Sequence, residues 1–480
     1  MTTRTASIVN LGCKVNQAEM EAAARLLRGR GVAVRSGYER ADLVLVNTCT
    51  VTAEADAKSR AAVRRARRAS PGARIVVTGC SVQTDPDAFA VADPAARLVD
   101  NRAKDALLAE LEALVGIPVE PAGPLDRPLP TVSGVELASA ADDRASVERT
   151  RAFVKVQDGC SYFCTYCIIP AARGPERSLA PEAVLADVRR ALAAGHREIV
   201  LTGINIGTYD GGWSERGRRG SHARSALTLG GLVRRLLAET GVERIRLSSI
   251  EPQHVDDELL EAWRDSGGRC LPHFHLPLQS GDDGVLRRMG RRYDAAAYAA
   301  TVARVRAAIP GVAIHGDVIV GFPTEDDAAW ERSLTFIRAI GFAGIHVFRY
   351  SARPGTPAIR MAGTVDERAK KRRAAAVLAL AGEARATFAA ASVGGEAEVL
   401  FESRLDDGRW TGHAANHVLV AAAGHGLENA IGRVMIDAID GEAAGRVRGT
   451  ILALDRPRHA IHRALPMGPA PHQLGGMHAG

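Results

Sequence analysis

The sequence predicts an α/β protein with three folded parts: an open parallel sheet at the amino terminus, a partial (βα)6 barrel in the middle and a small β-barrel at the carboxyl terminus. Short apolar runs alternate with helical stretches over residues 1–115, and the alternation resumes between residues 151 and 360. This pattern is typical of parallel sheets whose strands are joined by helices. Beyond residue 393, short strand patterns separated by glycine turns indicate the small β-barrel.

The amino-terminal part contains three apolar runs, and a cysteine follows each of them closely. The runs cover residues 7–11, 43–46 and 75–77, and the cysteines that follow them are Cys13, Cys49 and Cys80. Because the carboxyl ends of parallel strands meet at one edge of a sheet, we expect the three thiols to converge there. They form a candidate three-thiolate site.

The order of the parts sets the expected domain boundaries. The amino-terminal domain covers residues 1–115, and residues 116–146, rich in proline, glycine, alanine and serine, read as a linker. The central part follows over 147–378, the terminal barrel with its leading helix over 379–455, and a disordered tail over 456–480. The expected strands of the central part are Ala152–Gln157, Glu198–Thr202, Arg244–Ser249, His273–Leu278, Ala313–Val320 and Gly344–Tyr350.

A second group of three cysteines follows the first strand of the central part. Cys160, Cys164 and Cys167 have the spacing CxxxCxxC, and no fourth cysteine lies nearby. This spacing arises by chance in roughly one such chain per thousand, which disfavours three unrelated core thiols. A structural zinc site normally closes with four protein ligands, whereas three thiolates on a four-iron cluster leave one iron open for chemistry. A zinc half-site is the competing interpretation. Cys270 stands outside both groups and is expected to be a small buried residue.

The charge of the chain is moderately basic, with a formal net charge of +7. Seven basic and no acidic residues occur between Asp56 and Asp85, which indicates either a solvated helix face or a surface that contacts phosphates. No apolar run approaches the roughly 18 residues of a membrane span, and the first residues contain no apolar signal-peptide core. We therefore expect a cytoplasmic protein without a membrane partner.

The two cysteine groups carry a resemblance to a known family. Cys160–Cys167 continues into Ile168-Ile169-Pro170, and the upstream run is Gly12-Cys13-Lys14-Val15-Asn16-Gln17. Together they resemble the radical S-adenosylmethionine (SAM) methylthiotransferases, whose parts are an amino-terminal methylthiotransferase domain, a radical SAM barrel and a TRAM barrel. Within that family, the Cys13–Gln17 run and the His275–Gly281 strand are similar to the branch that adds a methylthio group to carbon 2 of N6-threonylcarbamoyladenosine in tRNA.

The resemblance implies two [4Fe-4S] clusters and SAM as cofactors. Cys160, Cys164 and Cys167 would hold the cluster that binds SAM and generates a 5′-deoxyadenosyl radical, and Cys13, Cys49 and Cys80 would hold an auxiliary cluster that carries sulfur. The residues expected to line the SAM pocket are Tyr166, Thr202, Gly203, Ser249, Glu251, Gln279, Val318 and Gly321. The resemblance further implies an electron donor, such as flavodoxin or ferredoxin, and a sulfur source as partners.

The expected tRNA surface follows from the distribution of charge. Residues 390–455 contain ten acidic and five basic residues, a formal charge of −5, and an acidic module binds phosphate poorly. We therefore expect the anticodon stem-loop of tRNA to contact the basic helix of the first domain and a basic turn over residues 368–373. The residues concerned are Arg64, Arg65, Arg67, Arg68, Lys370, Lys371, Arg372 and Arg373.

Three alternatives to this function stay open. In the first, the enzyme carries out the same chemistry on isopentenyladenosine in tRNA. In the second, which the acidic terminal barrel prompts, the substrate is a ribosomal protein. The third is a non-catalytic iron-sulfur protein that binds RNA or transfers electrons. His273 and His275 alternate on one strand face, where they form either a metal pair or a core or pocket wall. Trp410 and His413 either stack on a base or belong to the core of the terminal barrel.

Overall fold

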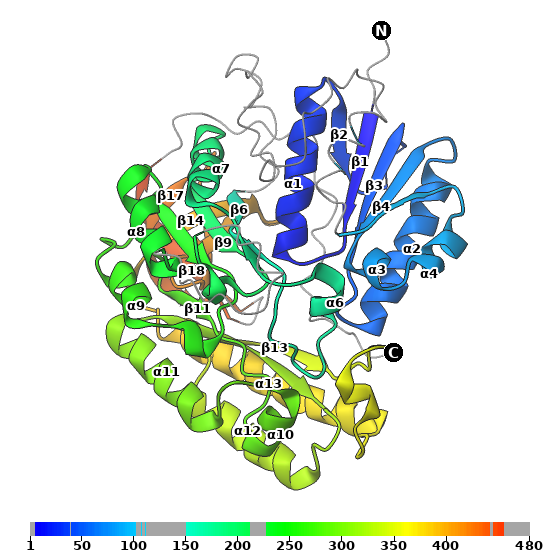
Figure 1. Ribbon diagram of the computed structural model, residues 1–480. Helices are drawn as coiled ribbons and strands as arrows, with labels where there is room; N and C mark the ends of the chain where they lie inside the picture. The colour runs from blue at the N-terminus through cyan, green and yellow to red at the C-terminus, as the bar shows by residue number, and fades with distance from the viewer. Residues whose placement is uncertain are drawn as a thin grey trace.

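The computed structural model describes residues 5–38, 40–101, 107, 111, 150–211, 227–441 and 445–455. It confirms the fold class: an open parallel sheet, a parallel barrel and a small closed β-barrel follow one another along the chain (Figure 1). The linker and the tail expected over 116–146 and 456–480 lie outside the described residues. None of the described helices combines the length and hydropathy that crossing a membrane requires.

The amino-terminal domain is a five-stranded sheet in the order β2-β1-β3-β4-β5, with all neighbours parallel. Its elements are β1 (Thr5–Asn10), α1 (Lys14–Gly29), β2 (Ala33–Ser36), β3 (Leu43–Thr48), α2 (Ala53–Ala69), β4 (Arg74–Gly79), α3 (Cys80–Thr84), α4 (Pro86–Ala92) and β5 (Arg97–Val99). Every residue of β3 is buried because α1 packs on one face of the sheet while α2 and α4 pack on the other. This two-sided burial explains the unbroken apolar runs in the sequence.

The central barrel is built from six parallel strands. They form two hydrogen-bonded sheets, β10-β9-β6 and β11-β12-β13. Isolated bridges connect the two sheets, one between residues 245 and 270 and one between 249 and 275. The strands are β6 (Arg151–Lys155), β9 (Glu198–Thr202), β10 (Arg244–Leu247), β11 (His273–His275), β12 (Ala313–Val320) and β13 (Gly344–Arg349). The fourth strand ends at His275, earlier than expected, because Pro277 offers no N–H to a ladder.

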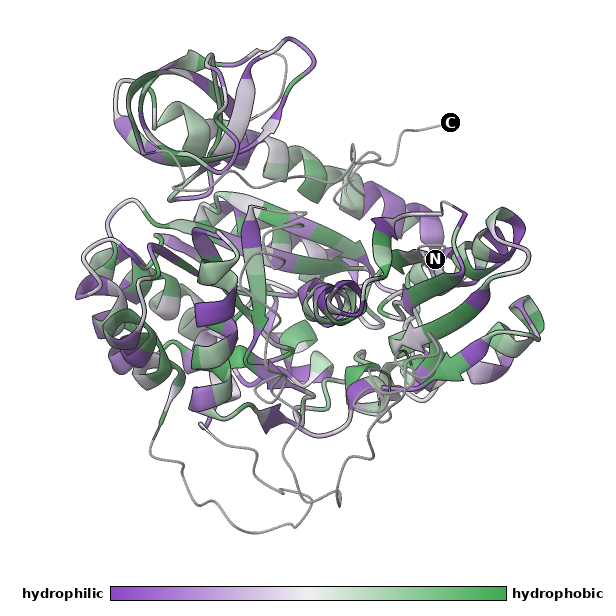
Figure 2. Ribbon diagram, turned by 90° about the horizontal axis from the view of Figure 1, so that it is seen from above, coloured by the Kyte–Doolittle hydropathy of each residue, from purple (hydrophilic) through white to green (hydrophobic). Residues whose placement is uncertain are grey.

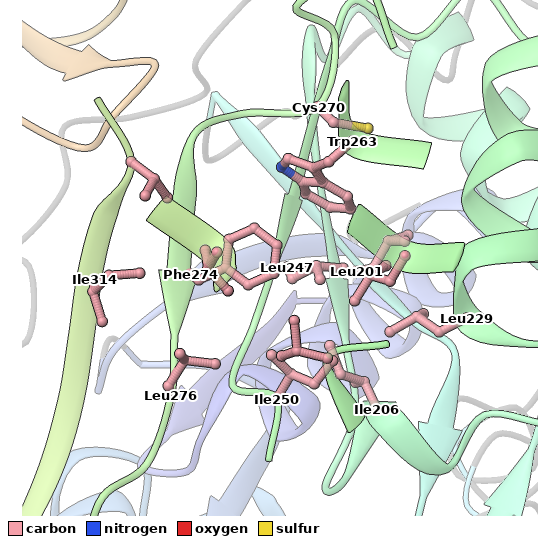
Figure 3. Packing of buried hydrophobic residues seen from close by; sticks show 14 of the residues in the cluster. Leu201, Ile206, Leu229, Leu247, Ile250, Trp263, Cys270, Phe274, Leu276 and Ile314 are labelled. Carbon is pink, nitrogen blue, oxygen red and sulfur yellow. The ribbon is translucent and has the colours of Figure 1, made fainter. Parts of the chain in front are cut away.

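Helices and short segments connect these strands. They are β7 (Gln157–Asp158), α6 (Ile169–Arg173), β8 (Arg177–Ser178), α7 (Pro181–Ala193), η2 (Ile206–Thr208), α8 (Leu229–Glu239), η3 (Pro252–His254), α9 (Asp257–Arg264), α10 (Asp283–Met289), α11 (Ala295–Ala308), α12 (Asp327–Ile340) and η4 (Pro357–Arg360). The core lies between the strands and this helical layer, and Figure 3 shows Leu201, Leu247 and Phe274 pointing into it. Cys270 lies in the same core and is 4% exposed, as the sequence predicted.

The terminal barrel follows a long helix, α13 (Glu367–Ala390), which runs along β13. Figure 2 shows this barrel as a distinct body at the end of the helix. Its strands are β14 (Glu396–Arg404), β15 (Trp410–Ala414), β16 (Leu419–Ala422), β17 (Ile431–Ile439) and β18 (Arg446–Asp455), closed in the order β14-β15-β16-β18-β17. The prediction of a basic turn over residues 368–373 is wrong. These residues form the first turns of α13, because the Asp366 carboxylate accepts a hydrogen bond from the Ala369 N–H at 2.9 Å and caps the helix.

Ion pairs attach the terminal barrel to the amino-terminal ends of the central strands. Arg244 pairs with Glu398 at 2.6 Å and Arg151 with Glu402 at 2.9 Å, and Arg197 pairs with Asp455. The three arginines lie at or just before the starts of β10, β6 and β9. Part of the acidic excess of the terminal barrel therefore faces arginines of the same chain.

Candidate functional site: two groups of three thiols

The first three-thiol group lies at one edge of the amino-terminal sheet. Cys13, Cys49 and Cys80 follow β1, β3 and β4, which are neighbours in that sheet. The thiols are close enough that Cys80 and Cys13 both act electrostatically on Cys49. The structure thus brings together the three residues that the sequence singled out.

The backbone around this group depends on two glycines. Gly79 has φ of +108°, and a Cβ there would overlap the Thr48 carbonyl oxygen. Only glycine therefore permits β4 to turn directly into α3, which begins at Cys80. A Cβ at Gly12 would overlap the side chain of Asn16, which accepts a hydrogen bond from the Cys13 thiol at 3.5 Å.

The second three-thiol group occupies the loop that follows β7, at the carboxyl ends of the barrel strands. Its loop is held by backbone hydrogen bonds from Cys160 N–H to the Gly174 oxygen at 3.1 Å and from Thr165 N–H to the Met289 oxygen at 2.9 Å. Gly159 has φ of +70°, and a Cβ there would overlap the Pro175 oxygen. Cys160 and Cys164 both act electrostatically on Cys167, so these thiols also converge.

The number and spacing of the thiols bear on the choice between the two metal chemistries. One zinc ion, bound at about 2.3 Å per sulfur, needs thiolates about 3.8 Å apart. Among the residues that the structure describes, the ligand groups whose donor atoms all lie within 4.8 Å of one another contain no cysteine. Three thiolates without a fourth protein ligand fit a four-iron cluster, in which each thiolate binds a different iron and one iron stays open.

Burial affects the thiols of both groups. It raises the pKa of Cys49 and Cys167 to about 12 and that of Cys160 to about 11. Since iron binds the thiolate, cluster insertion must release these protons.

The two groups face each other through α3 and α6. Helix α3 begins at Cys80, and it packs against α6, which begins two residues after Cys167. Asn101 connects both sides, because its side-chain amide donates to the Cys80 sulfur at 3.6 Å and to the Ala172 oxygen at 2.7 Å. Arg173 adds a second connection by donating to Asn16, and to Glu19 at 3.0 Å. Sequence reasoning missed Asn101 and Arg173, since neither belongs to a local motif.

Arg291 is a further residue that sequence reasoning missed. Its guanidinium donates to the Cys164 sulfur at 3.5 Å and to the Tyr166 hydroxyl at 3.3 Å, and it pairs with Glu251. Burial raises the pKa of Glu251, and Arg291 opposes that effect. The Arg-Arg-Tyr run directly after Gly290 was the available signal.

The other expected SAM contacts lie where barrel strands end, on the side of the second thiol group. Tyr166 packs edge-on against Phe322, with ring centroids 6.5 Å apart. Thr202 is buried with its hydroxyl oxygen unpaired, and a Cβ at Gly203 would approach the Gln157 side-chain oxygen to 2.9 Å. Ser249 bridges to the end of β11, and Gln279 adopts a positive φ of 69°.

Two of the expected SAM-pocket residues, Val318 and Gly321, present no exposed side chain at the strand ends. Val318 is 1% exposed and packs into the core between strands and helices, because alternate residues of β12 face opposite sides of the sheet. The half-buried residues of β12 are His315, Asp317 and Ile319, which face the barrel interior. The space beside Gly321 is filled by the side chain of Lys370.

Three of the eight expected tRNA contacts have their charges engaged within the protein, which corrects that prediction. Lys370 and Arg373 are 7% and 5% exposed, and Arg373 pairs with Glu325 at 2.8 Å. Arg67 pairs with Asp93 at 3.0 Å and donates to two carbonyls at the end of α2. Arg65 is exposed but lies over the Tyr38 ring at 4.4 Å. The remaining exposed residues are Arg64, Arg68, Lys371 and Arg372.

Lys14 stands beside the first thiol group and faces the barrel. It follows Cys13 at the start of α1, which packs on β6 (Figure 1). Lys14 is exposed to solvent, and Arg151, Arg246 and Asp317 of the barrel act on its charge; desolvation by the surrounding protein atoms together with the two arginines lowers its pKa to about 8. Within the described part of the chain, its ammonium has neither a hydrogen bond nor an ion pair. Among the described residues, Lys14 is thus a cation without a partner on the barrel side of the first thiol group.

Comparisons with known proteins agree with this geometry. Residues 5–100 match the family described as uncharacterized protein family UPF0004, and residues 154–337 match the radical SAM superfamily. A threonylcarbamoyladenosine tRNA methylthiotransferase, MtaB, from Bacillus subtilis is 36% identical over 90% of this chain and 92% of its own length. A tRNA-2-methylthio-N(6)-dimethylallyladenosine synthase from Maricaulis maris is 34% identical over 94% of this chain and 97% of its own.

Solved structures show the same fold at lower identity. The radical SAM methyltransferase TsrM from Kitasatospora setae, determined with cobalamin and a [4Fe-4S] cluster, has a TM-score of 0.51 at 17% identity and covers 74% of this chain and 77% of its own. The thiol geometry and the two full-length relatives lead to one assignment. The chain belongs to the radical SAM methylthiotransferases, enzymes that use SAM and [4Fe-4S] clusters.

Proposed function

We propose that the protein adds a methylthio group to carbon 2 of N6-threonylcarbamoyladenosine beside the anticodon of tRNA. The named relatives divide between this nucleoside and dimethylallyladenosine. The choice between them therefore rests on an observation in this chain, and that observation is Lys14.

The two nucleosides differ in the charge of the group on N6. The threonylcarbamoyl group ends in a carboxylate, whereas the dimethylallyl group is a hydrocarbon. An unpaired ammonium beside the auxiliary-cluster group is complementary to the carboxylate and would be costly next to the hydrocarbon. Lys14 lies one residue from Cys13, so a substrate whose carbon 2 approaches that cluster would bring its N6 group into the same region.

The proposal assigns the two thiol groups separate roles. Cys160, Cys164 and Cys167 would hold the cluster that binds SAM, with Tyr166, Thr202, Gly203, Ser249, Glu251 and Gln279 around the cofactor. Cys13, Cys49 and Cys80 would hold the auxiliary cluster. The low-potential cluster supplies the electron that cleaves SAM, which is chemistry that no side chain offers. The chain's own residues position substrate and cofactor between the clusters, and a flavodoxin or ferredoxin and a sulfur source would complete the reaction.

The acidic terminal barrel gives little support to a ribosomal-protein substrate. Glu398, Glu402 and Asp455 pair with arginines of the central barrel, so these charges are neutralised within the chain. The exposed arginines of α2 and the exposed Lys371 and Arg372 support a nucleic-acid substrate instead.

Mass spectrometry of tRNA nucleosides from a deletion strain tests the substrate. We expect loss of the 2-methylthio form of threonylcarbamoyladenosine, its recovery with the wild-type gene, and no recovery with Cys160→Ala. Loss of the 2-methylthio form of isopentenyladenosine alone would contradict the proposal.

A Lys14→Met substitution tests the observation that carries the proposal. On an anticodon stem-loop with threonylcarbamoyladenosine we expect KM to rise about ten- to hundred-fold, because a charge-assisted hydrogen bond of about 1.5–3 kcal/mol is lost. Lys14→Arg, which keeps the charge, should be much less affected. On the same stem-loop with the carboxylate blocked as its methyl ester, wild type and Lys14→Met should behave alike. An equal loss on both substrates would mean that Lys14 does not recognise the carboxylate.

A further inference from the structure

Three histidines from distant parts of the chain meet between the central and terminal barrels. His273 begins β11, His315 lies in β12, and His417 lies between β15 and β16 of the terminal barrel. One ring nitrogen of each lies within 4.8 Å of the others. The ring centroids are 4.6 Å apart for His273 and His315, and 4.6 Å for His273 and His417.

His273 lacks hydrogen-bond partners although it is 3% exposed. Neither Nδ1 nor Nε2 has a partner in the structure, and both atoms are buried. A neutral imidazole carries one donor and one acceptor, so burying both unpaired is unfavourable. Buried polar atoms without hydrogen-bond partners are rare in folded proteins and need an explanation. A bound ion is one of the few explanations available.

His417 adopts a backbone conformation that few side chains tolerate. Its φ is +71°, in the left-handed region that favours glycine, and its N–H donates to the Ala414 oxygen at 2.9 Å. This conformation stacks its ring on His273 at an interplanar angle of 23°. Strain that persists at one residue often marks a functional constraint.

Two cations lie near the three histidines, because Arg246 acts on all of them and Lys14 acts on His273 and His315. Arg246 lies near all three, and it pairs with Glu198 at 2.7 Å. His413, whose ring centroid is 4.6 Å from that of His417, donates through Nδ1 to the Glu402 carboxylate at 3.0 Å. A carboxylate bound to a histidine beside a metal site is a common supporting arrangement.

We propose that His273, His315 and His417 bind one zinc ion that joins the terminal barrel to the central barrel. Three imidazoles suit zinc among the divalent metals, with water or His413 as the fourth ligand. Small side-chain rotations would bring the nitrogens to the roughly 3.4 Å separation that a Zn–N distance of about 2.1 Å requires. The three proposed ligands belong to neither cysteine group.

Metal analysis of the full-length protein with both iron-sulfur clusters tests this site. The protein would be dialysed anaerobically against EDTA, equilibrated with zinc chloride, dialysed again and analysed for zinc and iron. We expect one zinc per chain in the wild type and none in His417→Gly, with equal iron in both. Glycine suits the positive φ at this position, so the variant removes the imidazole without backbone strain.

Two controls keep the result interpretable. His425→Ala, at an exposed histidine of the same barrel, should keep its zinc, and His315→Asn should lose it if His417→Gly proves unstable. X-ray absorption at the zinc edge should show nitrogen ligands. No zinc in the wild type, equal zinc in the wild type and both site variants, or sulfur ligands around the zinc would each overturn the proposal.

Discussion

At the scale of single residues, Arg291 connects more of the site than any local motif indicated. It contacts Cys164 and Tyr166 in the loop after β7 and Glu251 in the loop after β10, both at the mouth of the barrel. Its side chain is 3% exposed and that of Glu251 is 17% exposed, so the pair is largely removed from water. A buried pair of this kind is costly to break because the remaining charge has no partner.

Replacing Arg291 by Met should therefore lower the free energy of unfolding by about 3–5 kcal/mol. The double variant Arg291→Met/Glu251→Gln should recover part of the loss, because the unpaired carboxylate is gone. Anaerobic chemical denaturation measures both. The control is Arg292→Met, at an exposed arginine stacked on Tyr162 at 3.9 Å, and it should cost less than about 1 kcal/mol. Equal losses for the two single variants would contradict the role of Arg291.

Gly79→Ala should disturb the first thiol group without unfolding the sheet. The new methyl group would meet the Thr48 carbonyl in a backbone conformation that disfavours alanine, and Cys80 is the next residue. Iron in the reconstituted protein should fall from about eight atoms to about four per chain, since one of two four-iron clusters is lost. Gly72→Ala is the matched control, because nothing lies within 4 Å of its added Cβ. Unchanged iron in Gly79→Ala would show that the turn can adjust.

At the scale of secondary-structure elements, α2 serves two purposes. Its inner face packs on the sheet through Ala62, Val63 and Ala66, while Arg64 and Arg68 are exposed on its outer face. Thr52 caps its start by accepting a hydrogen bond from the Ala55 N–H at 3.1 Å. The helix thus holds a pair of free positive charges on a rigid support, which suits contact with an RNA backbone.

The double substitution Arg64→Ala/Arg68→Ala should weaken tRNA binding and reduce its dependence on salt. Each lost phosphate contact should reduce the slope of log K against log salt concentration by about 1. Filter binding across a salt series measures the slope. Arg433→Ala, at an exposed arginine of the acidic terminal barrel, should leave it unchanged. A slope that does not change in the double variant would place the RNA elsewhere.

At the scale of the whole molecule, the terminal barrel is attached to the end of the central barrel opposite the second thiol group. Arg151, Arg197 and Arg244 make the ion pairs, and Asn429 donates to the Gly195 oxygen at 2.8 Å. His196 lies at this junction, and burial lowers its pKa to about 4. The unfolded chain binds a proton at His196 below about pH 6.5, whereas the folded chain does not until about pH 4. Stability is therefore lost as the pH falls between these values.

His196→Gln should remove part of this acid sensitivity. Between pH 7 and pH 5 the wild type should lose about 1–2 kcal/mol more than the variant, allowing for the partial solvent contact of the ring. Urea denaturation at the two pH values measures the difference. Parallel losses in the two proteins would show that His196 does not titrate between the folded and unfolded states.

The sequence by itself determined the fold class and the two cysteine groups. Both follow from local patterns: apolar runs mark parallel strands, and residues just after neighbouring strands meet at one sheet edge. That is why Cys13, Cys49 and Cys80 could be grouped although they are far apart in the chain.

Only the tertiary structure decided which polar residues are free and which are engaged. Residues that are far apart in the sequence form ion pairs or ring contacts, as do Arg373 with Glu325, Arg244 with Glu398, and His273 with His417. No periodicity in the sequence encodes such partners, because they depend on how whole elements pack. The packing of whole elements also determines which side of β12 faces the core. Val318 is buried for that reason.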